Sequence, residues 1–188
     1  MMYQKILNEI TGVLNTISND EANNFVDKLI HSQRIYVIGE GRSGLIAKTF
    51  AMRLVHLRKR CFVVGETVTP ALRKGDVLLA VSGSGETRSV VETAQTARRL
   101  GAIVLCITAH RESSLLKNCN NCVVVPAKIM KKSLKSFELR ELEGDALEPP
   151  LGSLFEVSTL LFFECVVMEL MQKLKIGEKQ MYKTHPNL

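Results

Sequence analysis

The sequence contains no tryptophan, and aromatic side chains make up only 5% of its 188 residues. Any core is therefore expected to be packed from aliphatic side chains. Apolar residues at 46% and charged residues at 23% exclude an intrinsically disordered chain. A single domain over 1–188 is expected, because a chain of this length can bury about 70% of the surface that it exposes when unfolded.

The sequence also lacks a long uninterrupted apolar run. Lys5 and Glu9 fall among the first residues, where a signal peptide would be apolar. The most apolar stretch, 151–171, contains three glutamates and falls short of the roughly 20 apolar residues that a membrane span needs. We therefore expect no membrane association and a cytoplasmic location.

A disulfide framework is not expected. The five cysteines are odd in number and spread over predicted strands and helices, which indicates reduced thiols. Cys119 and Cys122 have the spacing of a metal or redox pair, but a zinc site would need two more ligands, and a redox pair would follow a strand and open a helix. This pair instead closes a predicted helix and begins a strand, so we interpret both as small buried side chains and expect no metal.

Basic residues interleaved with aromatic ones are absent as well. The net charge of +6 comes from scattered lysines and arginines. This pattern argues against a nucleic-acid partner. It suits ordinary solvated faces and a mildly positive protein that attracts small phosphorylated anions.

Five short apolar runs rich in β-branched residues predict strands that are buried on both faces. Helical patterns alternate with these runs, and the alternation predicts an α/β fold with a parallel sheet and right-handed crossovers within a core over 34–126. The predicted strands cover 34–39, 61–64, 76–82, 102–108 and 122–126. The predicted helices cover 44–58, 87–100 and 112–118, and two amphipathic helices lie within 2–31, the second opened by a capping box at Ser18 and Glu21.

The C-terminal part of the chain differs in character from this alternating core. The segment 127–148 is charged and has no clear period, which predicts a lid, a binding loop or a misread element. Within 150–188, a long helix is expected to follow Pro150 and to end at about Lys175. Its side chains are apolar on nearly all sides, which predicts burial against another subunit.

Two loops of small residues follow predicted strands. GEGRSG (39–44) follows the first strand, SGSGET (82–87) follows the third, and each opens a helix. Glycines let the backbone approach a ligand and the first amides of a helix attract anions, so the pair of loops predicts a phosphate site. The alternative is two tight turns with Ser and Thr as N-caps. The first loop has the spacing G-x-G-x-x-G of a dinucleotide site, but no acidic residue that could bind the ribose follows about 20 residues later, which argues against such a site. The lysine of a P-loop is missing as well.

These loops, together with VVGETVTPAL, PLGSLFE and the closing THPNL, resemble the sugar isomerase (SIS) domain family, and within it the 6-phospho-3-hexuloisomerases. The resemblance implies a flavodoxin-like, three-layer α-β-α sandwich with a five-stranded parallel sheet, in a homotetramer whose sites are shared between subunits. It implies the reversible conversion of D-arabino-hex-3-ulose 6-phosphate to fructose 6-phosphate through a cis-enediol, in the ribulose monophosphate pathway of formaldehyde fixation. It implies neither a metal nor an organic cofactor.

The resemblance also assigns site residues. Glu156 matches the catalytic base, and His185 matches a tail histidine that would enter a neighbouring subunit's site to move protons on oxygen. From the residues alone, Ser153 and Glu156 form a capping box, whose helix start would lower the basicity of the carboxylate, so substrate binding would have to supply desolvation. Arg42 could meet phosphate or solvent, and His56 is expected to complement the end of its helix. The expected substrate contacts are Ser43, Ser82, Gly83, Ser84, Gly85, Glu86 and Thr87.

Other functions stay open at this point. Another isomerase of the same fold could act on arabinose 5-phosphate or sedoheptulose 7-phosphate, and a non-catalytic module could bind a sugar phosphate. A sugar-phosphate-sensing regulator would need a DNA-binding module, but only about 33 residues precede the first strand, and they contain no basic recognition helix.

Overall fold

The computed structural model describes residues 2–127 and 151–183. Its five strands form one parallel sheet in the order β2-β1-β3-β4-β5. The α/β fold and the five-stranded parallel sheet are therefore confirmed, and every predicted strand overlaps an observed one. The strands are β1 (Arg34–Gly39), β2 (Arg60–Val63), β3 (Val77–Val81), β4 (Ile103–Thr108) and β5 (Asn121–Val124).

The helices also follow the sequence prediction, with one exception. They are α1 (Met2–Leu14), α2 (Asn19–His31), α3 (Gly41–His56), α4 (Arg88–Arg99), α6 (Leu151–Leu174) and α7 (Glu178–Tyr182). The helix expected over 112–118 is wrong, because only the 3-10 turn η1 (Leu116–Asn118) forms there. No α-helix forms there because the amides of Ser114 and Leu115 donate hydrogen bonds to the 82–87 loop instead of to carbonyls of the preceding turn. Among residues 2–127 and 151–183, no helix combines the length and the hydropathy that crossing a membrane would take.

Only one of the two hydrogen bonds of the predicted capping box forms at the start of α2. The Ser18 hydroxyl accepts a hydrogen bond from the Glu21 amide at 3.4 Å. The Glu21 carboxylate accepts bonds from the Arg111 side chain and from the Val124 amide. The carboxylate therefore ties the start of α2 to strand β5 at the edge of the sheet.

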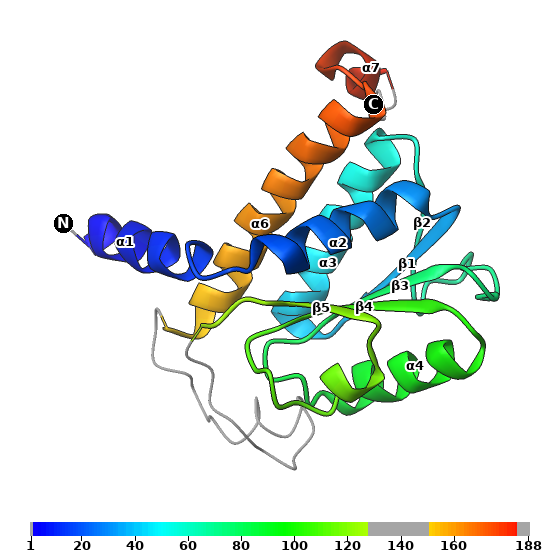
Figure 1. Ribbon diagram of the computed structural model, residues 1–188, viewed down its shortest axis with the longest axis horizontal. Helices are drawn as coiled ribbons and strands as arrows, with labels where there is room; N and C mark the ends of the chain where they lie inside the picture. The colour runs from blue at the N-terminus through cyan, green and yellow to red at the C-terminus, as the bar shows by residue number, and fades with distance from the viewer. Residues whose placement is uncertain (1, 128–150, 184–188) are drawn as a thin grey trace.

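Helices cover both faces of the sheet, as a three-layer sandwich requires (Figure 1). The helices α2, α3 and α6 pack on one face around a large apolar core. The other face carries α4 and η1 over a smaller core. Figure 1 also shows α1 extending away from the sheet at the N-terminal end of the chain.

The few aromatic side chains gather where α2, α3 and α6 meet. The rings of Phe50 and Phe163 stack with centroids 4.1 Å apart, and Phe25 lies against both of them. Aliphatic side chains make up most of this core, as expected, and the phenylalanines add to them where the three helices meet. Stacked rings supply both apolar area and a defined geometry. They fix α6 against α3, and this contact decides where the first turns of α6 lie relative to the loop that opens α3.

The strand order places the two glycine loops side by side. The chain leaves β1 toward β2 on one side and returns to β3 on the other, so β1 and β3 flank the point where crossovers diverge. Ligands of open parallel sheets bind at the carboxyl ends of the strands at such a point. Gly39 at the end of β1 is paired directly with Val81 at the end of β3. The loops that follow these two residues therefore start from neighbouring positions.

Candidate functional site

The first loop is a very close contact between backbone segments. A Cβ atom on Gly44 would lie 2.5 Å from the carbonyl oxygen of Gly39, and a Cβ atom on Gly39 would lie 2.9 Å from the carbonyl oxygen of Val81. Gly41 has a φ of 53°, in the left-handed region that favours glycine. The glycines therefore let α3 begin directly against the ends of β1 and β3.

The second loop is closed by its own side chains. The hydroxyl oxygens of Ser82 and Thr87 lie 2.9 Å apart, and the Gly85 amide donates to the Ser82 hydroxyl at 3.1 Å. The Ser84 hydroxyl accepts a bond from the Glu86 amide at 3.2 Å. Ser82 is buried, so its side chain holds the loop in shape, whereas Ser84 and Thr87 are partly exposed.

The outer side of the second loop is fixed to the segment that precedes η1. The Leu115 amide donates to the Gly85 carbonyl at 2.9 Å, and the Ser114 amide donates to the Glu86 carboxylate at 2.9 Å. The space beside Gly85, which has a φ of 65°, is filled by Ser113. These contacts set the loop geometry before any ligand arrives.

The two loops are joined to each other and present uncapped helix ends. The Glu40 carboxylate accepts a bond from the Ser89 hydroxyl at 2.8 Å, which links the start of α3 to the first turn of α4. Neither N-cap residue, Glu40 or Thr87, makes a side-chain capping bond. The first amides of a helix have no intrahelical partner and carry the positive end of its dipole. Two such ends side by side suit a phosphate group.

Glu156 approaches this pair of loops from α6. The Arg42 guanidinium lies 3.5 Å from one carboxylate oxygen of Glu156 and donates to the Ser153 hydroxyl at 3.2 Å. The side chain of Glu156 is only 14% exposed, and its second oxygen is buried without a hydrogen-bond partner within the described parts of the chain. Glu156, the predicted base, therefore lies beside the first loop, and Arg42 of that loop contacts its carboxylate.

Burial raises the pKa of Glu156, and its own amide and the Arg42 guanidinium oppose that rise without cancelling it. The prediction that Ser153 caps the helix is wrong, because Ser153 lies inside α6 and its hydroxyl binds Arg42. The expected dipole effect is correspondingly small, since it fades beyond the first turn. The carboxylate is already desolvated before substrate binds, contrary to the expectation that the substrate supplies this effect.

A third loop, which the sequence analysis quoted for the resemblance but did not assign to the site, borders the same end of the sheet. A cavity of about 360 Å³ is lined by the ends of β1 and β2 and the first turns of α3. Lys48 and Glu66 form an ion pair at 2.9 Å on its wall, next to Gly65. The available signal was the glycine in VVGET directly after a strand, which resembles the other two loops in position.

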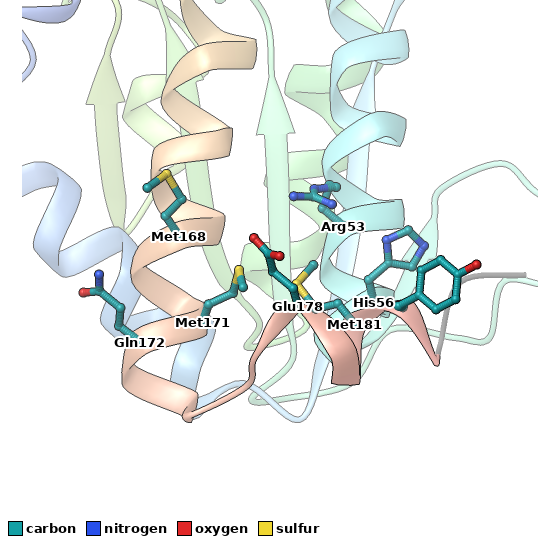
Figure 2. A pocket seen from close by; sticks show the side chains of 8 residues that line it. Arg53, His56, Met168, Met171, Gln172, Glu178 and Met181 are labelled. Carbon is teal, nitrogen blue, oxygen red and sulfur yellow. The ribbon is translucent and has the colours of Figure 1, made fainter.

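His56 lies far from these loops. It is buried at the last turn of α3, the end opposite the glycine loop, which agrees with the helix-end position expected for it. There it borders a cavity of about 550 Å³ between α3, α6 and α7. Figure 2 shows the labelled side chains of this cavity, which include Arg53 from α3 and Met168 and Met171 from α6. His56 is therefore not part of the loop site.

Two predicted features lie outside the described residues: His185 and the segment 127–148 apart from Ala127. Within residues 2–127 and 151–183, no group of three His, Cys, Asp or Glu side chains is arranged to hold a metal ion.

Comparison with known proteins gives consistent matches. The model of the SIS domain family matches residues 28–140. A Bacillus subtilis protein named 3-hexulose-6-phosphate isomerase is 39% identical over 98% of this chain and 95% of its own length. A Methanocaldococcus jannaschii protein of the same name is 32% identical over 97% of this chain and 94% of its own length. A crystal structure of a Methanococcus jannaschii protein, for which the function of a 3-hexulose-6-phosphate isomerase was inferred, matches with a TM-score of 0.79 at 31% identity and covers 97% of this chain and 96% of that one.

Proposed function

The chain belongs to the SIS domain family, and on this premise we propose that it is an isomerase that interconverts D-arabino-hex-3-ulose 6-phosphate and fructose 6-phosphate. Relatives named 3-hexulose-6-phosphate isomerase match it over nearly its whole length. The observation that carries the proposal is the position of Glu156, a buried carboxylate beside two joined, uncapped helix starts.

The substrate's phosphate would bind the second loop. Its amides face the ligand at the start of α4, and the partly exposed hydroxyls of Ser84 and Thr87 add donors. Ser43, in the first turn of α3, would reach the same ligand from the first loop. In this arrangement Ser82 and Glu86 fix the loop, because the Ser82 hydroxyl is buried and the Glu86 carboxylate accepts a bond from the Ser114 amide.

Glu156 would move the proton between carbons. In the direction of fructose 6-phosphate, it takes the proton from C2, the C–H electron pair forms the C2=C3 bond, and the C3 oxygen gains a proton. The cis-enediol then loses the proton of its C2 hydroxyl as the C2 carbonyl forms, and C3 receives a proton from the carboxyl group. One base over one face of the substrate serves both carbons, and a raised pKa brings the carboxylate closer to the operating pH.

His185 would assist from the tail of a neighbouring subunit. Fructose 6-phosphate closes a five-membered ring, whereas a 3-ketose phosphorylated at O6 has no hydroxyl placed to do so. Ring opening is therefore needed mainly in the reverse direction, and a histidine near the ring oxygen would supply a proton there.

A homotetramer is part of the same proposal. Two helices that pack against each other, α3 and α6, both expose apolar side chains. An uncovered apolar surface of this kind marks an interface. The exposed side chains are Leu45, Met52 and Val55 on α3 and Val157, Leu161 and Met168 on α6. The place of the reaction would be the ribulose monophosphate pathway, and reduced cysteines favour a cytoplasmic location.

The test is direct detection of the product. The purified chain is supplied with enzymatically made hexulose 6-phosphate, and fructose 6-phosphate is measured with a coupled assay. Ribose 5-phosphate and arabinose 5-phosphate serve as control substrates. We expect turnover of the hexulose phosphate alone; turnover of a pentose phosphate in its place would reassign the substrate, and no turnover of any of them would leave only a binding module.

A further inference from the structure

Three cysteines lie together on the α4 side of the sheet, away from the loop site. Cys106 on β4 is paired in register with Cys122 on β5. Cys119 ends η1 just before β5, and its sulfur is within hydrogen-bonding contact of the other two sulfurs. Cys106 is fully buried, whereas Cys119 and Cys122 are partly exposed, so the interpretation of this pair as buried side chains is wrong. We call these three residues the thiol cluster.

Cys119 is the central member of the thiol cluster. The thiols of Cys106 and Cys122 donate to its sulfur and lower its pKa, and the Arg98 guanidinium on α4 lowers it further, while burial opposes the shift. Burial raises the pKa of Cys106, and the bond with Cys119 raises that of Cys122, which also faces Glu21 and Arg111. A partly exposed cysteine with a lowered pKa, a cation nearby and a second thiol in contact is the arrangement of a reactive cysteine.

The backbone between Cys119 and Cys122 is held in a bend. Asn120 donates its amide to the Val104 carbonyl at 2.8 Å and accepts the Val104 amide on its side-chain oxygen at 2.8 Å. These two bonds fasten the stretch to β4 and keep its cysteines on one side. Cys122 stands on the edge strand β5, which has a sheet neighbour on one side only within the described residues.

We propose that Cys119 and Cys122 form a reversible intramolecular disulfide in exchange with a low-molecular-weight disulfide, RSSR. The Cys119 thiolate attacks one sulfur of RSSR, breaks the S–S bond and releases RS⁻. Cys122 then loses its proton and attacks the Cys119 sulfur of the mixed disulfide, releasing a second RS⁻. Two protein thiols are oxidised and one RSSR is reduced to two thiol equivalents.

The disulfide would lie one short turn from the phosphate loop. The Cys119 sulfur is 3.3 Å from the Leu116 carbonyl, and η1 continues from the residues whose amides hold Gly85 and Glu86. We therefore expect oxidation to raise the KM for the sugar phosphate severalfold; this consequence rests on the proposed function, whereas the disulfide itself does not.

Peptide mapping of the full chain tests the proposal. The reduced protein is incubated with glutathione disulfide, quenched with an alkylating agent and digested with trypsin. Cys119 and Cys122 share the peptide 118–128, while Cys106 lies in 100–111. We expect the peptide 118–128 to lack two hydrogens and to resist alkylation, and reduction to restore both thiols. A short cysteine-containing peptide in the same reaction reports, through its mixed disulfide, that the reagent is active.

Variants separate the two steps. Cys122→Ser should accumulate the mixed disulfide on Cys119, and Cys165→Ser should leave the intramolecular disulfide unchanged. Full alkylation of both cysteines while the added peptide carries its adduct, or a cross-link between 100–111 and 118–128, would overturn the proposal. A disulfide that forms without a change in KM would refute only the coupling to the loop, and loss of the disulfide in a chain with full turnover would leave the proposed function intact.

Discussion

Replacing Glu156 with glutamine separates the chemistry of this side chain from its structural role. Glutamine keeps the shape but cannot accept the C2 proton. General acid–base catalysis by one group contributes about 10²–10⁴-fold, so turnover should fall by that factor, equivalent to about 3–5 kcal/mol in the barrier. Binding of fructose 6-phosphate should be largely kept, because the proposed phosphate site lies in the two loops and not on α6.

The same substitution should not weaken the fold. At neutral pH the native protein must keep a desolvated carboxylate ionised, and the Arg42 pair at 3.5 Å is half exposed and worth under about 1 kcal/mol. Because burial raises the pKa of Glu156 in the folded state, folding favours the protonated form, and stability falls as pH rises through the unfolded and then the folded pKa. Glu156→Gln should therefore unfold at an equal or higher temperature at pH 7. The difference should vanish below about pH 4.3, where the wild-type side chain is neutral in both states.

The assays are steady-state kinetics, calorimetric titration with fructose 6-phosphate, and thermal unfolding at several pH values. Glu169→Gln is the matched control: it makes the same chemical change on the same helix, at a residue paired with Lys173. Its turnover should stay near that of the wild type. If Glu156→Gln kept its turnover within about threefold, Glu156 could not be the base. If it lost stability and binding together with turnover, its role would be structural.

Three further predictions follow from other contacts. Arg42→Ala removes a cation that lowers the pKa of Glu156, so the acidic limb of the pH profile of kcat/KM should move to higher pH. Arg42→Lys keeps the charge and is the control. An acidic limb that does not move in Arg42→Ala would contradict the assignment of that limb to Glu156. Gly44→Ala would put a Cβ atom 2.5 Å from the Gly39 carbonyl oxygen, so urea unfolding should show a loss of about 1–3 kcal/mol. Gly12→Ala is its control, because it has open space in α1 and should gain about 0.5–1 kcal/mol. Leu161→Asp should reduce the mass measured by light scattering from that of a tetramer to a smaller species, and an unchanged mass would remove α6 from the interface.

Much of the fold could be predicted because its signals are local. Each predicted strand is a short apolar run that ends at a glycine, a proline or a polar residue, and each such run became a strand within the same sheet. The segment 112–118 shows the limit of this reasoning. Its pattern is helical, yet the amides of Ser114 and Leu115 find partners in a loop 28 to 30 residues earlier in the chain. Long-range partners of this kind leave no mark in a local pattern.

The candidate site likewise combines local features, which the sequence could predict, with long-range contacts, which it could not. The glycines of both loops were predicted to let the backbone approach a ligand, and in the structure Gly39, Gly44 and Gly85 each lie against other atoms of the protein. In the first loop, Gly39 and Gly44 lie against backbone atoms of the strand ends and of each other. The sequence could not show the contact of Gly39 with Val81, because it depends on the register in which β1 pairs with β3. The joining bond between Glu40 and Ser89 likewise depends on two strands separated by a whole crossover.

The surroundings of Glu156 differ from those that its sequence pattern indicates. Four residues in the order S-x-x-E favour a cap, and a cap would hold the carboxylate ionised and weakly basic. In the structure α6 begins two residues earlier, at Leu151, so Ser153 is free to bind Arg42 and Glu156 falls in the second turn. Phe155, next to Glu156, is fully buried in the core that α3 and α6 share, and Phe163 further along α6 stacks on Phe50 of α3. Burial of Glu156, set against one partly solvated arginine, leaves the pKa of its carboxyl group above the ordinary value. The basicity of Glu156 is thus a property of the contact between α3 and α6, and substitutions in that contact should shift the acidic limb of the rate profile without touching the substrate.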